Sequence, residues 1–180
     1  MKPQPEFSRP VRSDTLSSGP RELSIGADEA ERVALARRFG LVSVERLSAE
    51  ASIKRDGEVI EAEGTLSAAV TQSCVASGAP VAAQIDEPFT IIFRPHPHHV
   101  REDEEEIELS GSDLDVVFYD GGAIDLGEAV AETLSLALDP YPRAPGSEET
   151  LKKVGVKSEE EAAPAGALAG LKDLLEGKKS

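Results

Sequence analysis

The chain has 180 residues, of which 39% are hydrophobic and 4% aromatic, with one cysteine and a formal net charge of −15. This length favours one domain with tails, and the single cysteine excludes an intramolecular disulfide and indicates a reducing compartment. The acidity opposes non-specific attachment to phosphate backbones, so no DNA partner is expected and any RNA contact must be local. Neither an apolar leader nor a run of eighteen apolar residues is present. We therefore expect a cytoplasmic protein with no membrane partner.

Residues 1–20 are expected to form an N-terminal arm with a possible edge strand around Phe7 and Val11, because four prolines and an S-S-G turn interrupt it. A solvated arm is the preferred interpretation. The arginines Arg9, Arg12 and Arg21 leave open an arm that contacts RNA.

A first helix is predicted from Asp28, where D-E-A-E forms a capping box and Gly40 provides the stop. Arg32, Arg37 and Arg38 lie along this helix. They either stabilise its negative C-terminal end or belong to a basic patch that contacts RNA.

Three alternating segments follow and predict long strands at residues 41–55, from Glu58 to residue 75, and at 81–93. Asp56 and Gly57 form a two-residue hairpin signal, and Gly64 stands where a bulge would bend the second strand. The fold class predicted is therefore α+β, with a long, bent antiparallel meander that curls into a partly closed, barrel-like sheet.

Residues 96–113 are predicted to form a mobile acidic loop, since eight carboxylates lie between Glu102 and Asp115 without a cation. His96, His98 and His99 precede it, but prolines and the absence of a helical spacing favour a polar loop over a metal site. A short strand is expected at residues 114–118.

Residues 123–146 carry the clearest helix signal. Asp125 caps the helix, and Glu128 is expected to reach back to the cap amide as in a capping box. An apolar stripe should pack on the sheet, and Pro140, Pro142 and Pro145 then hold an extended exit. With the first helix this gives two packed helices.

These signals divide the chain into an arm at residues 1–20, a single α+β domain at 21–146 and a mobile tail at 147–180. The tail contains a predicted short terminal helix at residues 167–176, which is too short to be stable alone.

No sequence pattern supports catalysis. The chain lacks a nucleophile elbow, a phosphate-binding loop and a dinucleotide fingerprint, so we expect no enzyme, no cofactor and no metal site. Cys74, at the end of a predicted strand, is expected to be a small buried hydrophobic residue.

Three segments carry a family likeness: V-T-Q-S-C-V-A-S-G-A-P-V at residues 70–81, the run I-D-L-G-E-A-V-A-E-T-L-S-L-A-L-D-P-Y-P-R-A-P-G from Ile124, and A-L-A-G-L-K-D-L near the C-terminus. In content, order and separation they resemble the YceD-like family of bacterial large-subunit ribosomal RNA accumulation proteins. Many relatives carry C-x-x-C where this chain has Cys74 and Ser77, and one thiolate cannot hold a structural zinc ion.

The resemblance implies a non-enzymatic factor in ribosome biogenesis and rRNA processing that binds a large-subunit rRNA precursor or a ribosomal protein. The RNA contacts suggested are Arg9, Arg12, Arg32, Arg37 and Arg38. Packing does not explain the exit and the helix face beside it, so a partner surface is predicted at Asp125, Glu128, Glu132, Tyr141, Pro142 and Arg143. The alternatives are an acidic chaperone-like module that shields a basic protein and, with less support, a metal-dependent hydrolase.

Overall fold

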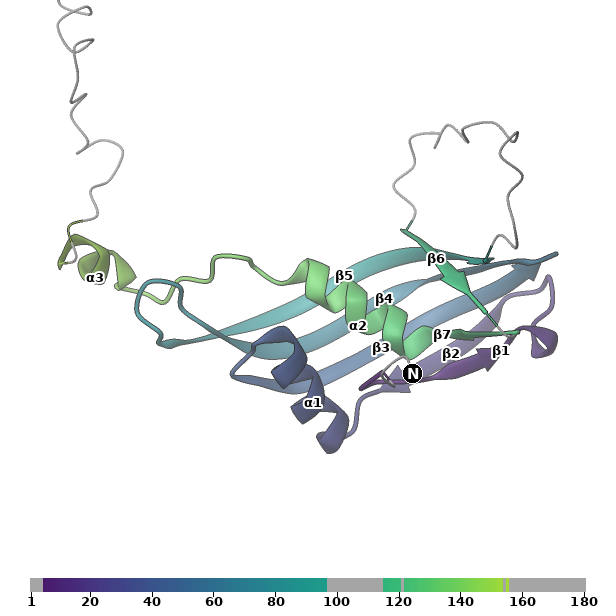
Figure 1. Ribbon diagram of the computed structural model, residues 1–180, viewed down its shortest axis with the longest axis horizontal. Coiled ribbons are helices and arrows are strands. Elements are labelled where there is room, and N and C mark those ends of the chain that lie inside the picture. Colours follow the sequence, from purple (N-terminus) through teal and green to yellow (C-terminus); the bar gives the residue numbers. More distant parts are fainter. Residues whose placement is uncertain (1–4, 97–114, 121, 154, 156–180) are drawn as a thin grey trace, which may run out of the picture.

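The structure is a computed structural model that describes residues 5–96, 115–120, 122–153 and 155 (Figure 1). Seven strands and three α-helices confirm the α+β class within these residues. The strands are β1 (Pro10–Arg12), β2 (Arg21–Gly26), β3 (Ser43–Asp56), β4 (Val59–Ser73), β5 (Pro80–Pro95), β6 (Asp115–Tyr119) and β7 (Ala123–Asp125). The helices are α1 (Glu29–Phe39), α2 (Leu126–Ala137) and α3 (Ser147–Lys153), and a 3-10 turn spans Ser13–Thr15. None of these helices is long and apolar enough to cross a membrane.

The main sheet has the order β2-β3-β4-β5-β6. The strands β2 to β5 pair antiparallel as a meander, which confirms the three long strands predicted from alternation. Asp56 pairs with Val59 across the first hairpin, so the two loop residues are Gly57 and Glu58, one position later than predicted. Gly57 has a φ of 61°, a left-handed conformation that glycine adopts without steric cost.

The last strand of the main sheet, β6, departs from the predicted antiparallel meander. β6 pairs parallel with β5, with Ile91 opposite Asp115 and Pro95 opposite Tyr119. The strand order leaves β2 and β6 as the two edges of an open sheet, so the predicted barrel-like closure is not confirmed. β1 and β7 form a separate two-stranded antiparallel sheet.

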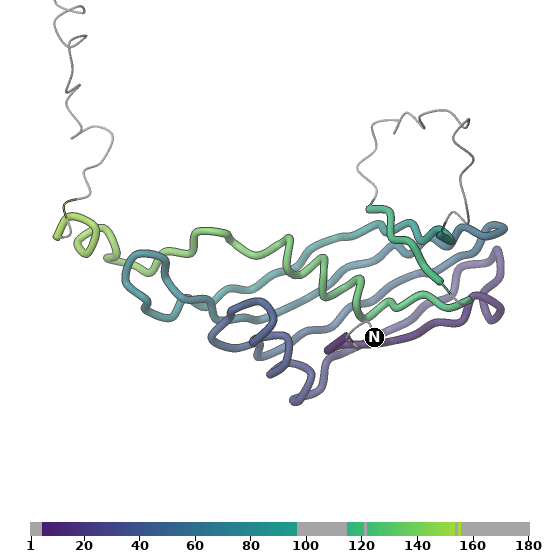
Figure 2. The backbone as a smooth tube through the Cα atoms, in the orientation of Figure 1, coloured from purple at the N-terminus to yellow at the C-terminus, as the bar shows by residue number. Residues whose placement is uncertain are grey.

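Helix α2 lies along one face of the main sheet, and α1 packs against β3 near one end of the sheet (Figures 1 and 2). The apolar stripe predicted for α2 is buried, including Leu126, Val130 and Leu134. These side chains share one core with sheet residues such as Ile91 and Phe93. Burial of each such side chain stabilises the fold by roughly 1.5–3 kcal/mol.

The N-terminal segment belongs to this core. Phe7 is 0% exposed and Leu16 is buried, so the solvated-arm interpretation of residues 1–20 is wrong for the part that the structure describes. The edge strand expected near Val11 exists as β1 and pairs with β7. The segment crosses α2 at Gly127, where an added Cβ would lie 2.4 Å from the carbonyl oxygen of Phe7.

The first helix forms as predicted. The Asp28 side chain accepts a hydrogen bond from the amide of Glu31, while the Glu31 carboxylate accepts from the amide of Asp28. Gly40 ends the helix in the left-handed conformation at φ 66°.

The bulge predicted at Gly64 is absent from β4. Gly64 pairs in register with Ala51 and Phe89, and the irregular pairing lies instead between Val44 and Arg46 of β3. Glycine is required at position 64 for a different reason, because a Cβ there would lie 2.1 Å from the carbonyl oxygen of Glu50. The residue permits close backbone approach rather than a bend.

Helix α3 lies within the segment predicted as a mobile tail, beyond the β4–β5 turn (Figure 1). The expected helix at residues 167–176 and residues 97–114 of the acidic loop lie outside the described residues, as do His98 and His99. His96 stacks on Phe118 of β6, with ring centroids 5.3 Å apart.

Candidate functional site

An open hollow of about 430 Å³ lies between β1 and β2, the edge strands of the two sheets. We call it the arginine groove, because Arg9, Arg12 and Arg21 line it. Its apolar lining includes Val11, Leu23 and Ile25, and Pro10 and Thr15 complete it. Two of these arginines were predicted as RNA contacts from sequence, and the third lies in the same candidate basic segment.

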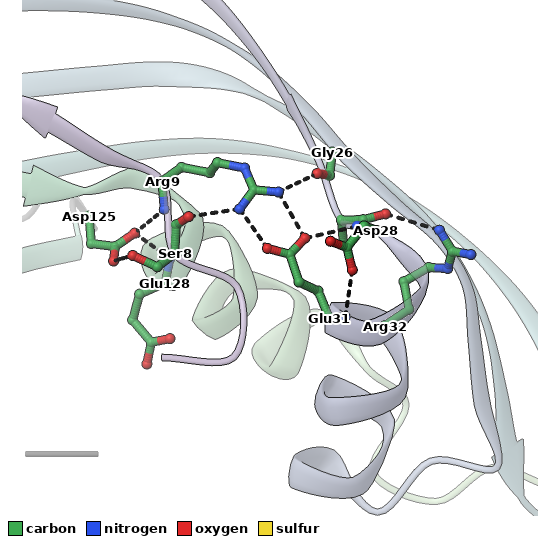
Figure 3. Close-up of polar contacts among 9 residues, drawn as sticks. Ser8, Arg9, Gly26, Asp28, Glu31, Arg32, Asp125 and Glu128 are labelled. Atoms are coloured by element: carbon green, nitrogen blue, oxygen red, sulfur yellow. Dashed lines mark hydrogen bonds and ion pairs between the residues drawn. The ribbon is translucent and has the colours of Figure 1, made fainter. Parts of the chain in front are cut away.

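Arg9 lines one side of the groove, and several hydrogen bonds hold its guanidinium in place (Figure 3). Its guanidinium donates to both carboxylate oxygens of Glu31 at 2.6 and 2.8 Å and to the carbonyl oxygen of Gly26 at 2.7 Å. It also lies 4.6 Å from the ring centroid of Phe7. These hydrogen bonds raise the pKa of Arg9 and lower the pKa of Glu31, so the pair stays charged. Arg9 is therefore mainly structural.

Arg12 and Arg21 are exposed and more weakly held. Arg12 donates to both carboxylate oxygens of Asp14 at 2.5 and 3.0 Å, but both side chains are open to solvent, which screens the pair. Arg21 donates to the hydroxyl of Thr15 at 3.4 Å and has no ion pair among the described residues. These two guanidinium groups are available to an anionic ligand.

The other predicted RNA contacts lie elsewhere. Arg32 and Arg37 line a separate hollow of about 220 Å³, and Arg32 donates to the carbonyl oxygen of Ala27 at 3.0 Å. Arg38 donates to both carboxylate oxygens of Glu128 at 2.7 and 2.9 Å and to Glu6 at 2.9 Å. Arg38 thus ties α1 to α2 and to the N-terminal segment, and the predicted set does not form one patch.

Three of the predicted partner-binding residues, Asp125, Glu128 and Glu132, line a hollow of about 230 Å³ that also includes β6 residues. Asp125 caps α2 by accepting from the amide of Glu128, and it also accepts from the Ser8 hydroxyl and the Arg9 amide. The predicted return bond from Glu128 to the cap amide is wrong, since its carboxylate binds Arg38 instead. Desolvation, followed by the nearby charge of Glu128, raises the pKa of Glu132.

The other three predicted partner-binding residues lie in the exit after α2. Pro142 is buried, and its carbonyl oxygen accepts from the amide of Val75 at 2.9 Å. The Gln72 side chain donates to the carbonyl oxygen of Asp139 at 2.8 Å, which fixes the exit on the end of β4. Tyr141 remains 72% exposed beside an exposed Arg143.

A comparison with known protein families shows to which family the chain belongs. A family model described as "Large ribosomal RNA subunit accumulation protein YceD" matches residues 62–175. The chain belongs to the YceD family. This confirms the resemblance found in the sequence. Comparison with curated proteins and comparison with solved structures each gave no match.

The YceD match covers the exit, the hollow beside α2 and Cys74, whereas all the arginines proposed as RNA contacts precede it. The family description names the accumulation of an RNA rather than a chemical reaction. Within the described residues, no three His, Cys, Asp or Glu side chains are grouped to hold a metal ion.

Cys74 has an electrostatic property that sequence reasoning missed. It is buried, as predicted, in the turn that follows β4. The amide of Ala144 and the Ser77 hydroxyl donate to its sulfur and lower the pKa of the thiol to about 6. No sequence signal indicates this property, because the contact between the Cys74 turn and the Pro-rich exit is visible only in the fold.

Proposed function

We propose that this YceD-family protein is a non-enzymatic cytoplasmic factor that supports the accumulation of large-subunit ribosomal RNA by binding its precursor. The observation that carries the proposal is the arginine groove, where Arg12 and Arg21 flank an open hollow in a chain of net charge −15. In so acidic a protein, a local cationic site is the part able to accept phosphates.

The charges around the groove support local rather than general RNA binding. Glu31 balances Arg9 and Asp14 balances Arg12, which leaves Arg21 without an ionic partner among the described residues. Because the Arg12–Asp14 pair is exposed, a phosphate replaces Asp14 at little cost. Binding should therefore weaken steeply as salt concentration rises.

Crosslinking in cells, followed by identification of the captured RNA and protein, tests the proposal. We expect precursor large-subunit rRNA to be recovered with the wild-type protein and to be lost with the Arg12→Glu/Arg21→Glu variant. The matched control is Arg94→Glu, a reversal at an exposed arginine of β5. Recovery of neither ribosomal RNA nor a ribosomal protein would contradict the proposal.

A protein partner is the second candidate, favoured by the apolar surface near the exit. Tyr141 is 72%, Leu136 78% and Val75 55% exposed. The hydrogen bond from the Val75 amide to the Pro142 carbonyl holds the Cys74 turn against the exit. Exposed aromatic residues and arginines such as Tyr141 and Arg143 are typical of residues that dominate protein interfaces.

The test of this second candidate is a folded Tyr141→Ala/Arg143→Glu double variant. If the exit binds a ribosomal protein, this variant should lose that protein in the crosslinking experiment while it keeps the rRNA. Undiminished recovery of the ribosomal protein would remove the exit from the partner surface.

The least supported alternative is the metal-dependent hydrolase. Elemental analysis of the purified protein decides it. A stoichiometric bound metal ion, together with hydrolytic activity that chelation abolishes, would overturn the non-enzymatic proposal.

A further inference from the structure

We infer that the arginine groove takes a single-stranded RNA segment and excludes duplex RNA. This inference rests on the proposed function and names the form of RNA that the same site recognises. It follows from the unpaired backbone edges of β1 and β2, the apolar lining between them and the position of the two available arginines.

The edge of β2 presents unpaired backbone groups. The amide of Ala27 donates to Leu47 in β3, and antiparallel pairing alternates, so the backbone groups of Ile25, Leu23 and Arg21 also face β3. Those of Glu22, Ser24 and Gly26 therefore point away from the sheet. The Gly26 carbonyl accepts from Arg9, while no hydrogen bond donated by the amides of Glu22 and Ser24 is found within the described residues.

The edge of β1 borders the other side of the groove. The bonds from Ser13 to Gly122 and from Leu126 to Arg9 show that Arg9, Val11 and Ser13 face β7. Pro10 and Arg12 therefore turn their backbone groups outward, and Pro10, which has no amide, fits an edge position. The Arg12 carbonyl accepts from the Thr15 hydroxyl, and among the described residues no hydrogen bond from the Arg12 amide is found.

This arrangement suits an unstacked base better than a base pair. Val11, Leu23 and Ile25 are half-buried and offer an apolar surface to a base, while the outward amides of Ser24 and Arg12 are donors for the edge of a base. A hollow of about 430 Å³ lies within the ~300–1,000 Å³ typical of small-ligand sites. In a duplex the faces of the bases are stacked and their edges are paired, so only the phosphates of the duplex would reach the arginines.

The experiment compares two probes on the full-length protein: an unstructured oligouridine of about 12 nucleotides and a fully paired hairpin with the same number of phosphates. We expect the single strand to bind at least about tenfold more tightly. For the Arg12→Gln variant, the slope of log affinity against log salt should become shallower by about 0.7, the value for one phosphate contact on a single strand. Arg94→Gln should leave the slope unchanged.

The backbone edge has its own variant. Ser24→Pro removes the outward amide without removing a bond of the β2–β3 ladder, because position 24 faces away from β3. We expect a folded protein with at least about threefold weaker oligouridine binding and an unchanged salt slope. Ser24→Ala, which keeps the amide, is the matched control and should bind as wild type. If Ser24→Pro fails to fold, N-methylation of the same amide by chemical ligation provides the same test.

Equal affinity for the two probes, or a preference for the hairpin, overturns this inference. Such a result leaves the proposed function standing if crosslinking in cells still recovers precursor rRNA through Arg12 and Arg21. If crosslinking in cells recovers no precursor rRNA with the wild-type protein, the proposed function itself is contradicted, whatever the two probes show. Oligouridine binding that survives Arg12→Glu/Arg21→Glu places single-strand recognition outside the groove and also overturns the inference.

Discussion

At the scale of single residues, Cys74 provides a test that depends on one sulfur atom. The Ala144 amide and the Ser77 hydroxyl stabilise its thiolate and lower the thiol pKa to about 6. We expect the ultraviolet absorbance of the thiolate to titrate with a midpoint near pH 6, and the Ser77→Ala variant to titrate at a higher pH. Cys74→Ser should show no such transition. A midpoint near 8.5, the ordinary value for cysteine, would contradict the hydrogen bonding described.

The same lowered pKa has a consequence for stability. A thiol whose folded pKa is below its unfolded value stabilises the fold fully at pH values above the unfolded pKa, and the contribution is lost as pH falls through the folded value. The Cys74 contribution to the free energy of unfolding should therefore decrease between about pH 8.5 and pH 6. Comparison of wild type with Cys74→Ser across this range measures it.

Arg9 and Glu128 show what sequence patterns miss at the residue scale. Arg9 was a candidate RNA contact, but its guanidinium is occupied by Glu31 and Gly26. Glu128 had the spacing of a capping box, yet it binds Arg38, which is 90 residues away. A local pattern shows which bonds a side chain is able to make, whereas the fold decides between them by bringing a cation within reach.

At the scale of elements, the contact between the N-terminal segment and α2 depends on Gly127. A Cβ at this position would lie 2.4 Å from the Phe7 carbonyl oxygen and 2.9 Å from the Arg9 amide nitrogen. Because both neighbours are backbone atoms, the Gly127→Ala variant must displace the segment. We expect the free energy of unfolding to fall by about 1–3 kcal/mol, measured by urea denaturation.

A matched control exists at Gly19, where a Cβ would meet its nearest neighbour at an ordinary 3.6 Å. Gly19→Ala should leave the unfolding midpoint almost unchanged. Because Arg9 follows the crossing point and lines the arginine groove, Gly127→Ala should also weaken oligouridine binding. Wild-type stability of Gly127→Ala would mean that the segment does not cross α2 so closely.

Elements with complete local signals were predictable. Capping and stop residues located α1 and the start of α2, and alternation with the Asp56 and Gly57 turn located β3 and β4. The pairing of β1 with β7 was not predictable, because three residues carry too little pattern and the partners lie more than a hundred residues apart. The parallel pairing of β6 with β5 was not predictable either, because no residue of β6 specifies which strand of the sheet it joins or in which direction. The arginine groove lies between strands that are placed by such long-range pairings. The sequence therefore indicated its arginines as candidates but did not show that they lie close together.

At the scale of the whole molecule, the segment that carries the family match is smaller than the folding unit. The match begins at residue 62, whereas β2, β3 and α1 precede it and Phe7 fills the core from the N-terminal segment. A fragment of residues 62–175 would leave β4 without its partner β3 and expose the core beneath it. The described core residues all lie between Phe7 and Leu134.

We therefore expect the fragment 62–175 to show no cooperative thermal unfolding by circular dichroism, since a sheet that loses its neighbouring strands loses its buried face. Residues 1–155 retain every described element and should unfold cooperatively with a midpoint close to that of the full chain. Addition of residues 1–61 as a separate chain should restore cooperative unfolding if the missing strands are the cause. Cooperative unfolding of residues 62–175 alone would show that the family segment is an independent domain and that the arginine groove is attached to it rather than part of its core.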